Sequence, residues 1–157
     1  ANLIKKNNLT KEICFIMRDF SEGKKFVKKF GYSLILLPKK PDRKDHVNVF
    51  ERLNPDLLIS FCSPEASRVG FGLGIPHIAF SDSPHAEAVM RLSLPYAAKL
   101  LTPWIIPKSD FEGFGINRKN IISYKAIDAG IIIKNYQKNK QKKINRKNQF
   151  HRKNLPN

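Results

Sequence analysis

Long hydrophobic runs are missing from this sequence of 157 residues. No apolar stretch approaches the ~20 residues that a membrane-spanning helix requires, and the opening residues, ANLIKKNNLTKE, lack the apolar core of a secretory signal. Cysteine is scarce as well. Cys14 and Cys62 each lie within an apolar run, which favours two buried thiols over a disulfide or a reactive nucleophile. These absences predict a soluble protein of the cytoplasm with no membrane span.

Acidic residues are outnumbered, and one part of the chain has none. The whole sequence contains 29 Lys and Arg against 13 Asp and Glu, for a net charge of +16. Residues 134–157 carry nine of the basic residues and no acidic residue, so residues 1–133 are only about +7. Lys, Asn, Gln and Arg fill this terminal segment, and such a composition offers little surface to bury. We predict one α/β domain over 1–133 and a disordered, basic, low-complexity tail over 134–157.

The sequence lacks several motifs that indicate a cofactor, a metal site or a hydrolytic triad. His46, His77 and His151 have no Cys or His at the spacing of metal ligands, and no Gly-x-Ser-x-Gly motif occurs. The glycine-rich stretch over 70–74 follows a predicted helix and precedes a strand, whereas a dinucleotide fingerprint follows a strand. We interpret Gly74 as a helix cap and Gly70 and Gly72 as positions of close packing. The sequence predicts no metal and no cofactor.

Short apolar runs alternate with segments whose apolar residues are spaced three or four apart, and this pattern is typical of βαβ units. Strands are predicted at 13–17, 33–37, 56–61, 77–80, 99–102 and 121–123, and the helices between them at 21–30, 46–53, 65–73 and 85–94. Strands that are apolar on both faces and joined by helical crossovers indicate a parallel sheet covered on both sides. We therefore expect a doubly wound, mostly parallel, Rossmann-like sheet of five or six strands.

Two of the predicted strand-to-helix turns resemble each other. Ser63 and Pro64 follow one strand, and Ser83 and Pro84 follow the next. Ser is a favoured helix cap and Pro a favoured first helical residue, so each pair predicts a helix start. One interpretation is purely structural, namely two well-capped helices. The other is an anion site, because the N–H groups of two adjacent helix starts at the carboxyl edge of a sheet would attract a phosphate or a sugar diphosphate.

In the anion-site interpretation, charged side chains near these turns become candidates for chemistry. His85 would lie in a first helical turn, which favours the neutral imidazole as a base or a hydrogen-bond partner. Asp82 would end a strand, where a carboxylate commonly accepts from substrate hydroxyls. We take His85 and Asp82 as the candidate catalytic residues, and Ser63, Glu65, Ser83 and Glu87 as candidate ligand-binding residues.

The run SPEASRVGFGLGIPHIAFSDSPHAEAVMRLSLPYAAKLLTPWIIP, residues 63–107, resembles the signature region of a prokaryotic family, domain of unknown function 354, in the glycosyltransferase-B clan. The resemblance extends over most of residues 1–133, including the turn at Arg18 and Asp19 and the segment 115–128. It implies the N-terminal half of a two-domain fold similar to UDP-N-acetylglucosamine 2-epimerases and nucleotide-sugar glycosyltransferases. Arg18 joins the candidate ligand-binding residues through this resemblance.

The sequence also departs from the family pattern. Relative to the family, a first strand with its loop is expected before residue 1, and a second Rossmann-like domain is expected where the basic tail lies. The resemblance thus implies a glycosyltransferase- or epimerase-like domain that acts on a nucleotide-activated sugar or its acceptor. An isolated half would be inactive, would need a partner chain to supply the second domain, or would be a fragment of a decayed gene.

A different class of function is a non-enzymatic binding module whose basic tail contacts nucleic acid or another anionic partner. The tail has few aromatic residues, so its contacts with nucleic acid would be non-specific and salt-dependent. A third interpretation, which we favour over nucleic-acid binding, is that the tail is a solvated linker.

Overall fold

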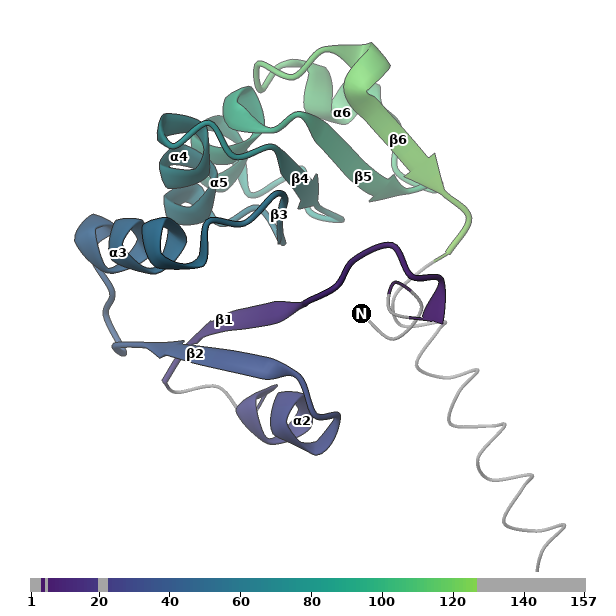
Figure 1. Ribbon diagram of the computed structural model, residues 1–157. Coiled ribbons are helices and arrows are strands. Elements are labelled where there is room, and N and C mark those ends of the chain that lie inside the picture. The colour runs from purple at the N-terminus through teal and green to yellow at the C-terminus, as the bar shows by residue number, and fades with distance from the viewer. Residues whose placement is uncertain (1–3, 5, 20–22, 127–157) are drawn as a thin grey trace, which may run out of the picture.

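The computed structural model describes residues 4, 6–19 and 23–126 of the chain (Figure 1). The predicted tail over 134–157 lies outside the described residues. The strands are β1 (Cys14–Arg18), β2 (Ser33–Leu37), β3 (Leu58–Ser60), β4 (His77–Phe80), β5 (Lys99–Pro103) and β6 (Ile121–Tyr124). The α-helices are α2 (Gly23–Lys29), α3 (Arg43–Leu53), α4 (Pro64–Gly72), α5 (Glu87–Ser93) and α6 (Ser109–Glu112), and the 3₁₀ helices are η1 (Leu94–Tyr96) and η2 (Arg118–Asn120). Strands and helices alternate, as the periodicity predicts.

All strand pairs in the described residues are parallel, but they form two sheets instead of the single sheet predicted. β1 pairs with β2, and the second sheet has the order β3-β4-β5-β6. The crossover through α3 carries the chain from β2 to β3, and these two strands are not hydrogen-bonded to each other. The α/β class with Rossmann-like parallel strands is confirmed, and the prediction of one continuous sheet is wrong. Local periodicity marks each strand but carries no information about which strands are neighbours.

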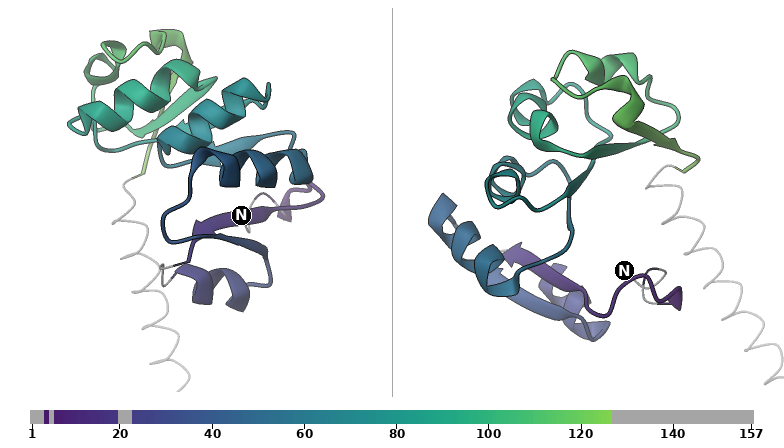
Figure 2. Two further views of the ribbon diagram at one scale, coloured as in Figure 1. Left: turned by 90° about the vertical axis from the view of Figure 1, so that its left-hand side faces the viewer. Right: turned by 45° about the horizontal axis from the view of Figure 1, so that its top comes forward.

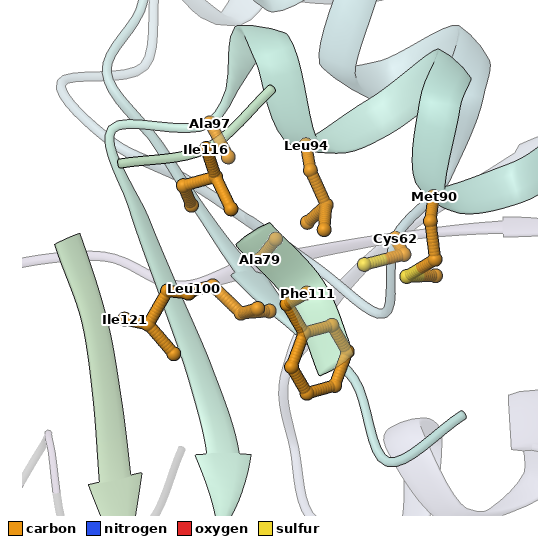
Figure 3. Packing of buried hydrophobic residues seen from close by; sticks show 9 residues of the cluster. All are labelled: Cys62, Ala79, Met90, Leu94, Ala97, Leu100, Phe111, Ile116 and Ile121. Atoms are coloured by element: carbon orange, nitrogen blue, oxygen red, sulfur yellow. The ribbon is translucent and has the colours of Figure 1, made fainter. Parts of the chain in front are cut away.

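The four-stranded sheet has one thoroughly buried face. Ala79, Leu100 and Ile121 lie side by side in register on β4, β5 and β6, and each is at most 1% exposed. Met90 from α5 and Phe111 from α6 pack against the same cluster (Figure 3). These helices therefore cover one side of the sheet.

A second core cluster spans both sheets. Leu37 of β2, Val49 and Phe50 of α3, and Val69 of α4 are buried together, and half-buried side chains from β1 and β3 pack against them. Helices α3 and α4 contact each other along this cluster. The helical layer is therefore continuous across the place where the strands divide into two sheets (Figure 2).

Caps set the ends of the two longer helices. Asp42 accepts from the N–H of Asp45, whose side chain accepts in turn from the N–H of Asp42, so this capping box starts α3 at Arg43, three residues before the predicted start. Gly74 follows α4 with a φ of 71°, which confirms it as the glycine of the helix end. A Cβ at Gly70 would lie 3.0 Å from Cδ2 of Leu58, so close packing is confirmed there. At Gly72 a Cβ would meet nothing within 4 Å, so the same prediction is wrong.

In the described part of the chain, no helix combines the length and the apolar character needed to cross a membrane.

Candidate functional site

The start of α4 follows the carboxyl end of β3 after a short turn, as the sequence predicts. Ser63 is the N-cap, and its hydroxyl accepts from the N–H of Ala66 at 3.3 Å. Pro64 is the first helical residue. The Ser63-Pro64 pair is therefore confirmed as a capped helix start.

This helix start offers fewer free donors than the anion-site interpretation assumes. Pro64 has no N–H, the N–H of Ala66 is bonded to the cap, and the N–H of Ser67 is bonded to the carbonyl of Ser63 at 2.9 Å. The remaining N–H in this first turn belongs to Glu65, whose own carboxylate is negatively charged and disfavours a bound anion. A ligand that binds here must therefore be recognised largely by side chains and by the field of the helix.

The second predicted helix start is wrong. Helix α5 begins at Glu87, after Ala86, and has no side-chain cap. The Ser83 hydroxyl donates instead to Oδ1 of Asp82 at 2.8 Å, and the N–H of Ser83 donates to the hydroxyl of Ser81 at 3.2 Å. The carbonyl of Ser83 accepts from Ala86, so residues 83–86 form a turn before the helix. The Ser83 side chain thus forms its hydrogen bond within the loop, and this local bond competes with capping of the helix.

The charged candidates near this loop are solvent-exposed. Asp82 and His85 are exposed, and so is Glu87 in the first turn of α5. Glu87 also lies 3.6 Å from Arg91 in an i,i+4 ion pair. β3 and β4 are hydrogen-bonded neighbours, so the loop that follows β4 and the start of α4 project from the same edge of the sheet. Ser63, Asp82 and Ser83 are therefore candidates for one site.

Two other candidates lie beside other elements. Arg18 ends β1, which belongs to the other sheet. Glu65 lines a small hollow of about 180 Å³ between α3 and α4, together with Asp42, Arg43 and Arg68. The structure thus places Glu65 beside the start of α3.

A buried polar pair supports the start of α4, and the sequence interpretation missed it. Nε2 of His77 lies 2.9 Å from the hydroxyl of Ser60, which also accepts from the N–H of Ser63 at 3.2 Å. His77 is 1% exposed, and its burial lowers its pKa, which favours the neutral imidazole. Nδ1 of His77 and the hydroxyl of Thr102 are buried and have no hydrogen-bond partner among the described residues. The interaction depends on the register of Leu58 opposite His77, which no local motif announces.

The thiols are not placed for chemistry at this edge. Cys62 follows β3 with a φ of 47°, is 3% exposed, and belongs to the core cluster beneath α5. Burial raises its pKa to about 11, partly offset by a hydrogen bond with Ser81. Cys14 is half-buried, and burial followed by the charge of Glu12 raises its pKa. Neither thiol is activated as a thiolate at neutral pH. Among the described residues no three His, Cys, Asp or Glu side chains gather as metal ligands.

A comparison with known protein families identifies the family of this chain. A model of the family described as "Protein of unknown function (DUF354)" matches residues 2–154. The chain belongs to this family. The uncharacterized protein MJ0665 of Methanocaldococcus jannaschii is similar to this chain, with 36% identity over 76 residues. That alignment covers 48% of this chain and 22% of the archaeal protein, and no solved structure matches the chain. The DUF354 match runs past residue 133 into the basic segment.

Proposed function

We propose that this DUF354 chain binds a nucleotide-activated sugar, or the acceptor of a sugar, at the carboxyl edge of β3 and β4. The observation that carries the proposal is the juxtaposition of the Ser63-capped start of α4 with the exposed Asp82 loop at the ends of two paired parallel strands. Ligands of open α/β sheets bind beyond the carboxyl ends of the strands. The resemblance to glycosyltransferase-B proteins supports the choice of a nucleotide sugar by analogy of fold.

Two kinds of recognition are available at this edge. The start of α4 carries a partial positive charge that favours a phosphate. It is nevertheless a weak anion site, because few backbone N–H groups are left to donate and the Glu65 carboxylate repels an anion. Asp82 is a hydrogen-bond acceptor suited to sugar hydroxyls, and Ser83 already holds one of its carboxylate oxygens at 2.8 Å. We therefore assign the hydroxyl-rich part of the ligand to the Asp82 loop.

If the site is catalytic, Asp82 or His85 is the base that removes a proton from an acceptor hydroxyl. Both side chains are exposed, so a second domain or a partner chain is needed to exclude water and to complete the cleft. Enzymatic activity at this edge therefore depends on what closes over it.

Ligand-observed NMR with UDP-N-acetylglucosamine tests the proposal. Saturation transfer from the chain to the sugar and nucleotide protons is expected, and Asp82→Asn should reduce it at least threefold. Asp110→Asn is the matched control, because Asp110 is another exposed carboxylate that accepts from a neighbouring serine, at 3.2 Å. Equal transfer in the two variants, or none in the parent chain, would refute the assignment of the site.

A non-enzymatic binding module is the second candidate, and the net charge of +16 supports it. Basic segments bind phosphates by releasing counterions, so the affinity for a short single-stranded oligonucleotide should fall at least tenfold between 50 and 200 mM salt. Affinity that survives the higher salt would point to a specific nucleic-acid site instead.

A further inference from the structure

The hollow between the starts of α3 and α4 is a second place where a small ligand can bind. Each helix starts after the carboxyl end of a strand, α3 after β2 and α4 after β3, and the two helices contact each other. The hollow is therefore on the side of the fold where ligands of open α/β sheets bind. Its volume is about 180 Å³, and its lining residues are Pro41, Asp42, Arg43, Glu65, Arg68 and Val69.

Packed elements hold the walls of this hollow in place. Val69 is 5% exposed and belongs to the core cluster to which β2, α3 and α4 all contribute. The start of α3 is fixed by its capping box, in which the carboxylate of Asp42 accepts from the N–H of Asp45 at 2.9 Å. The carbonyl of Asp42 also lies 2.9 Å from Nδ1 of the buried His46. The hollow is thus preformed, as small-molecule sites usually are.

Within the described residues, two guanidinium groups at this hollow have no acidic partner. Arg43 and Arg68 are both exposed, and neither side chain forms a hydrogen bond or an ion pair in this part of the chain. A ligand would therefore displace only water from them. The planar fork of arginine matches the oxygens of a phosphate, to which it donates two parallel hydrogen bonds. Exposed lysines at positions 39, 40 and 44 add positive charge to the same segment.

The hollow also contains an acceptor for hydroxyl groups. Glu65 lies one turn before Arg68 on α4, and among the described residues its carboxylate has no hydrogen-bond partner. Carboxylates accept hydrogen bonds from sugar hydroxyls, and the apolar surfaces of Pro41 and Val69 suit the C–H face of a sugar ring. Cations beside such an acceptor fit a ligand with both a phosphate and hydroxyl groups. The carboxylates of Glu65 and Asp42 would instead repel a simple anion.

The volume of the hollow limits the size of that ligand. Pockets for drug-sized ligands typically enclose about 300–1,000 Å³, and a nucleotide-activated sugar needs a pocket of this class. A hollow of about 180 Å³ is smaller and suits one sugar ring with its phosphate.

We propose that the hollow between α3 and α4 binds a monosaccharide phosphate, with Arg43 and Arg68 on the phosphate and Glu65 on the sugar hydroxyls. The inference is independent of the proposed sugar-nucleotide site, because it makes no use of Asp82 or His85. Backbone donors contribute little, because the capping box already occupies the N–H groups of Asp42 and Asp45.

Amide chemical-shift mapping of the full chain with glucose 6-phosphate tests the proposal. We expect shifts at residues 42–45 and 67–69, which surround the hollow. Inorganic phosphate and glucose are the partial probes, and each should bind about tenfold more weakly because it lacks part of the contacts. Equal affinity for inorganic phosphate and glucose 6-phosphate, or no shifts around the hollow, would overturn the proposal. Shifts confined to residues 81–87 would assign the probe to the edge of β3 and β4 and would also overturn it.

Neutral variants of the two arginines test the phosphate contacts. Arg43→Gln and Arg68→Gln should each weaken the binding of glucose 6-phosphate about tenfold, because each removes a charge-assisted hydrogen bond. Arg52→Gln is the matched control, since it removes the same charge from an exposed arginine in the last turn of α3. The control should change the affinity less than about twofold, because salt screens distant exposed charges. Equal losses in all three variants would indicate a general attraction to positive charge and would overturn the site.

Glu65→Ala separates recognition of the sugar from recognition of the phosphate. The variant should weaken the binding of glucose 6-phosphate about threefold, because it removes a hydroxyl acceptor. It should strengthen the binding of inorganic phosphate, because it also removes a negative charge. A change in the same direction for both probes would overturn the assignment of the sugar to Glu65. Circular dichroism establishes that the variants fold.

Discussion

The hydroxyl of Ser60 lies 2.9 Å from Nε2 of the buried His77, which joins the carboxyl end of β3 to the first residue of β4. The same hydroxyl accepts from the N–H of Ser63, the cap of α4. A buried imidazole therefore supports the turn from which the candidate site is built, although it does not itself face that site. Its neutral form matters because a charged imidazole in this core would lose solvation without gaining a partner.

The lowered pKa of His77 predicts a loss of stability in acid. Since the folded chain holds His77 neutral, the unfolded chain binds the extra proton as the pH falls below its ordinary value of about 6.5. The stabilisation is complete above that pH and is lost as the pH falls toward the folded pKa. The free energy of unfolding should decline there by up to ~1.4 kcal/mol per pH unit. Urea unfolding at several pH values measures this slope.

His77→Gln is the control for that slope. Glutamine retains an amide that can bond Ser60 but does not titrate, so the variant should lose less stability between pH 6.5 and 5 than the parent chain. Identical pH dependence in the two proteins would show that His77 does not contribute.

The serines of the two Ser-Pro turns should contribute differently to the free energy of unfolding. Ser63→Ala removes a cap that satisfies the N–H of Ala66 and should lower the free energy of unfolding by ~1 kcal/mol. Ser83→Ala removes a hydroxyl that bonds the exposed Asp82 and should cost less than ~0.5 kcal/mol. Chemical denaturation of both variants makes the comparison, and equal losses would contradict the described start of α5.

Two glycines of α4 give a second matched pair. Gly72→Ala adds a methyl group into open space and should stabilise the helix by about 0.5–1 kcal/mol. Gly70→Ala has the same gain in helix propensity, but its Cβ meets Leu58 at 3.0 Å, so its net stabilisation should be smaller or absent. A larger gain for Gly70→Ala would contradict the packing of α4 on β3.

The two cysteines should react with Ellman's reagent at different rates. Cys14 is half-buried and should react first at pH 8, whereas Cys62 is 3% exposed with a pKa of about 11 and should react only when the chain unfolds. Cys14→Ser and Cys62→Ser assign the two phases. Fast labelling of the Cys14→Ser variant in the absence of denaturant would be inconsistent with this core.

The elements of the fold were predictable because strong local signals mark them. The strand over 33–37 and the glycine that ends α4 match the structure, since an apolar run and a residue with positive φ are encoded within a few positions. The division into two sheets was not predictable in this way, because it depends on pairing between distant strands. The contact of Ser60 with His77 was not predicted for the same reason, because it also depends on which strands pair.

One of the two helix starts expected near the candidate site was predictable. Ser63 was identified correctly because a Ser-Pro pair after an apolar run is a strong helix-start signal. The same signal at Ser83 failed, because the short loop gives its hydroxyl a nearer partner in Asp82 and the helix starts later, at Glu87. A sequence motif records which groups can cap a helix, whereas the loop geometry decides which group does.

Amide chemical-shift mapping with UDP-N-acetylglucosamine tests the central claim, namely a sugar-nucleotide site at the carboxyl edge of β3 and β4. We expect shifts at residues 63–66 and 81–87, saturating in the millimolar range, which corresponds to roughly 4 kcal/mol of binding free energy because the candidate side chains Asp82 and His85 are exposed to water. Replacing Asp82 or His85 should reduce these shifts. Shifts confined to residues 134–157, or none at millimolar ligand with a folded sample, would contradict the sugar-nucleotide site and leave Ser63 as a structural cap.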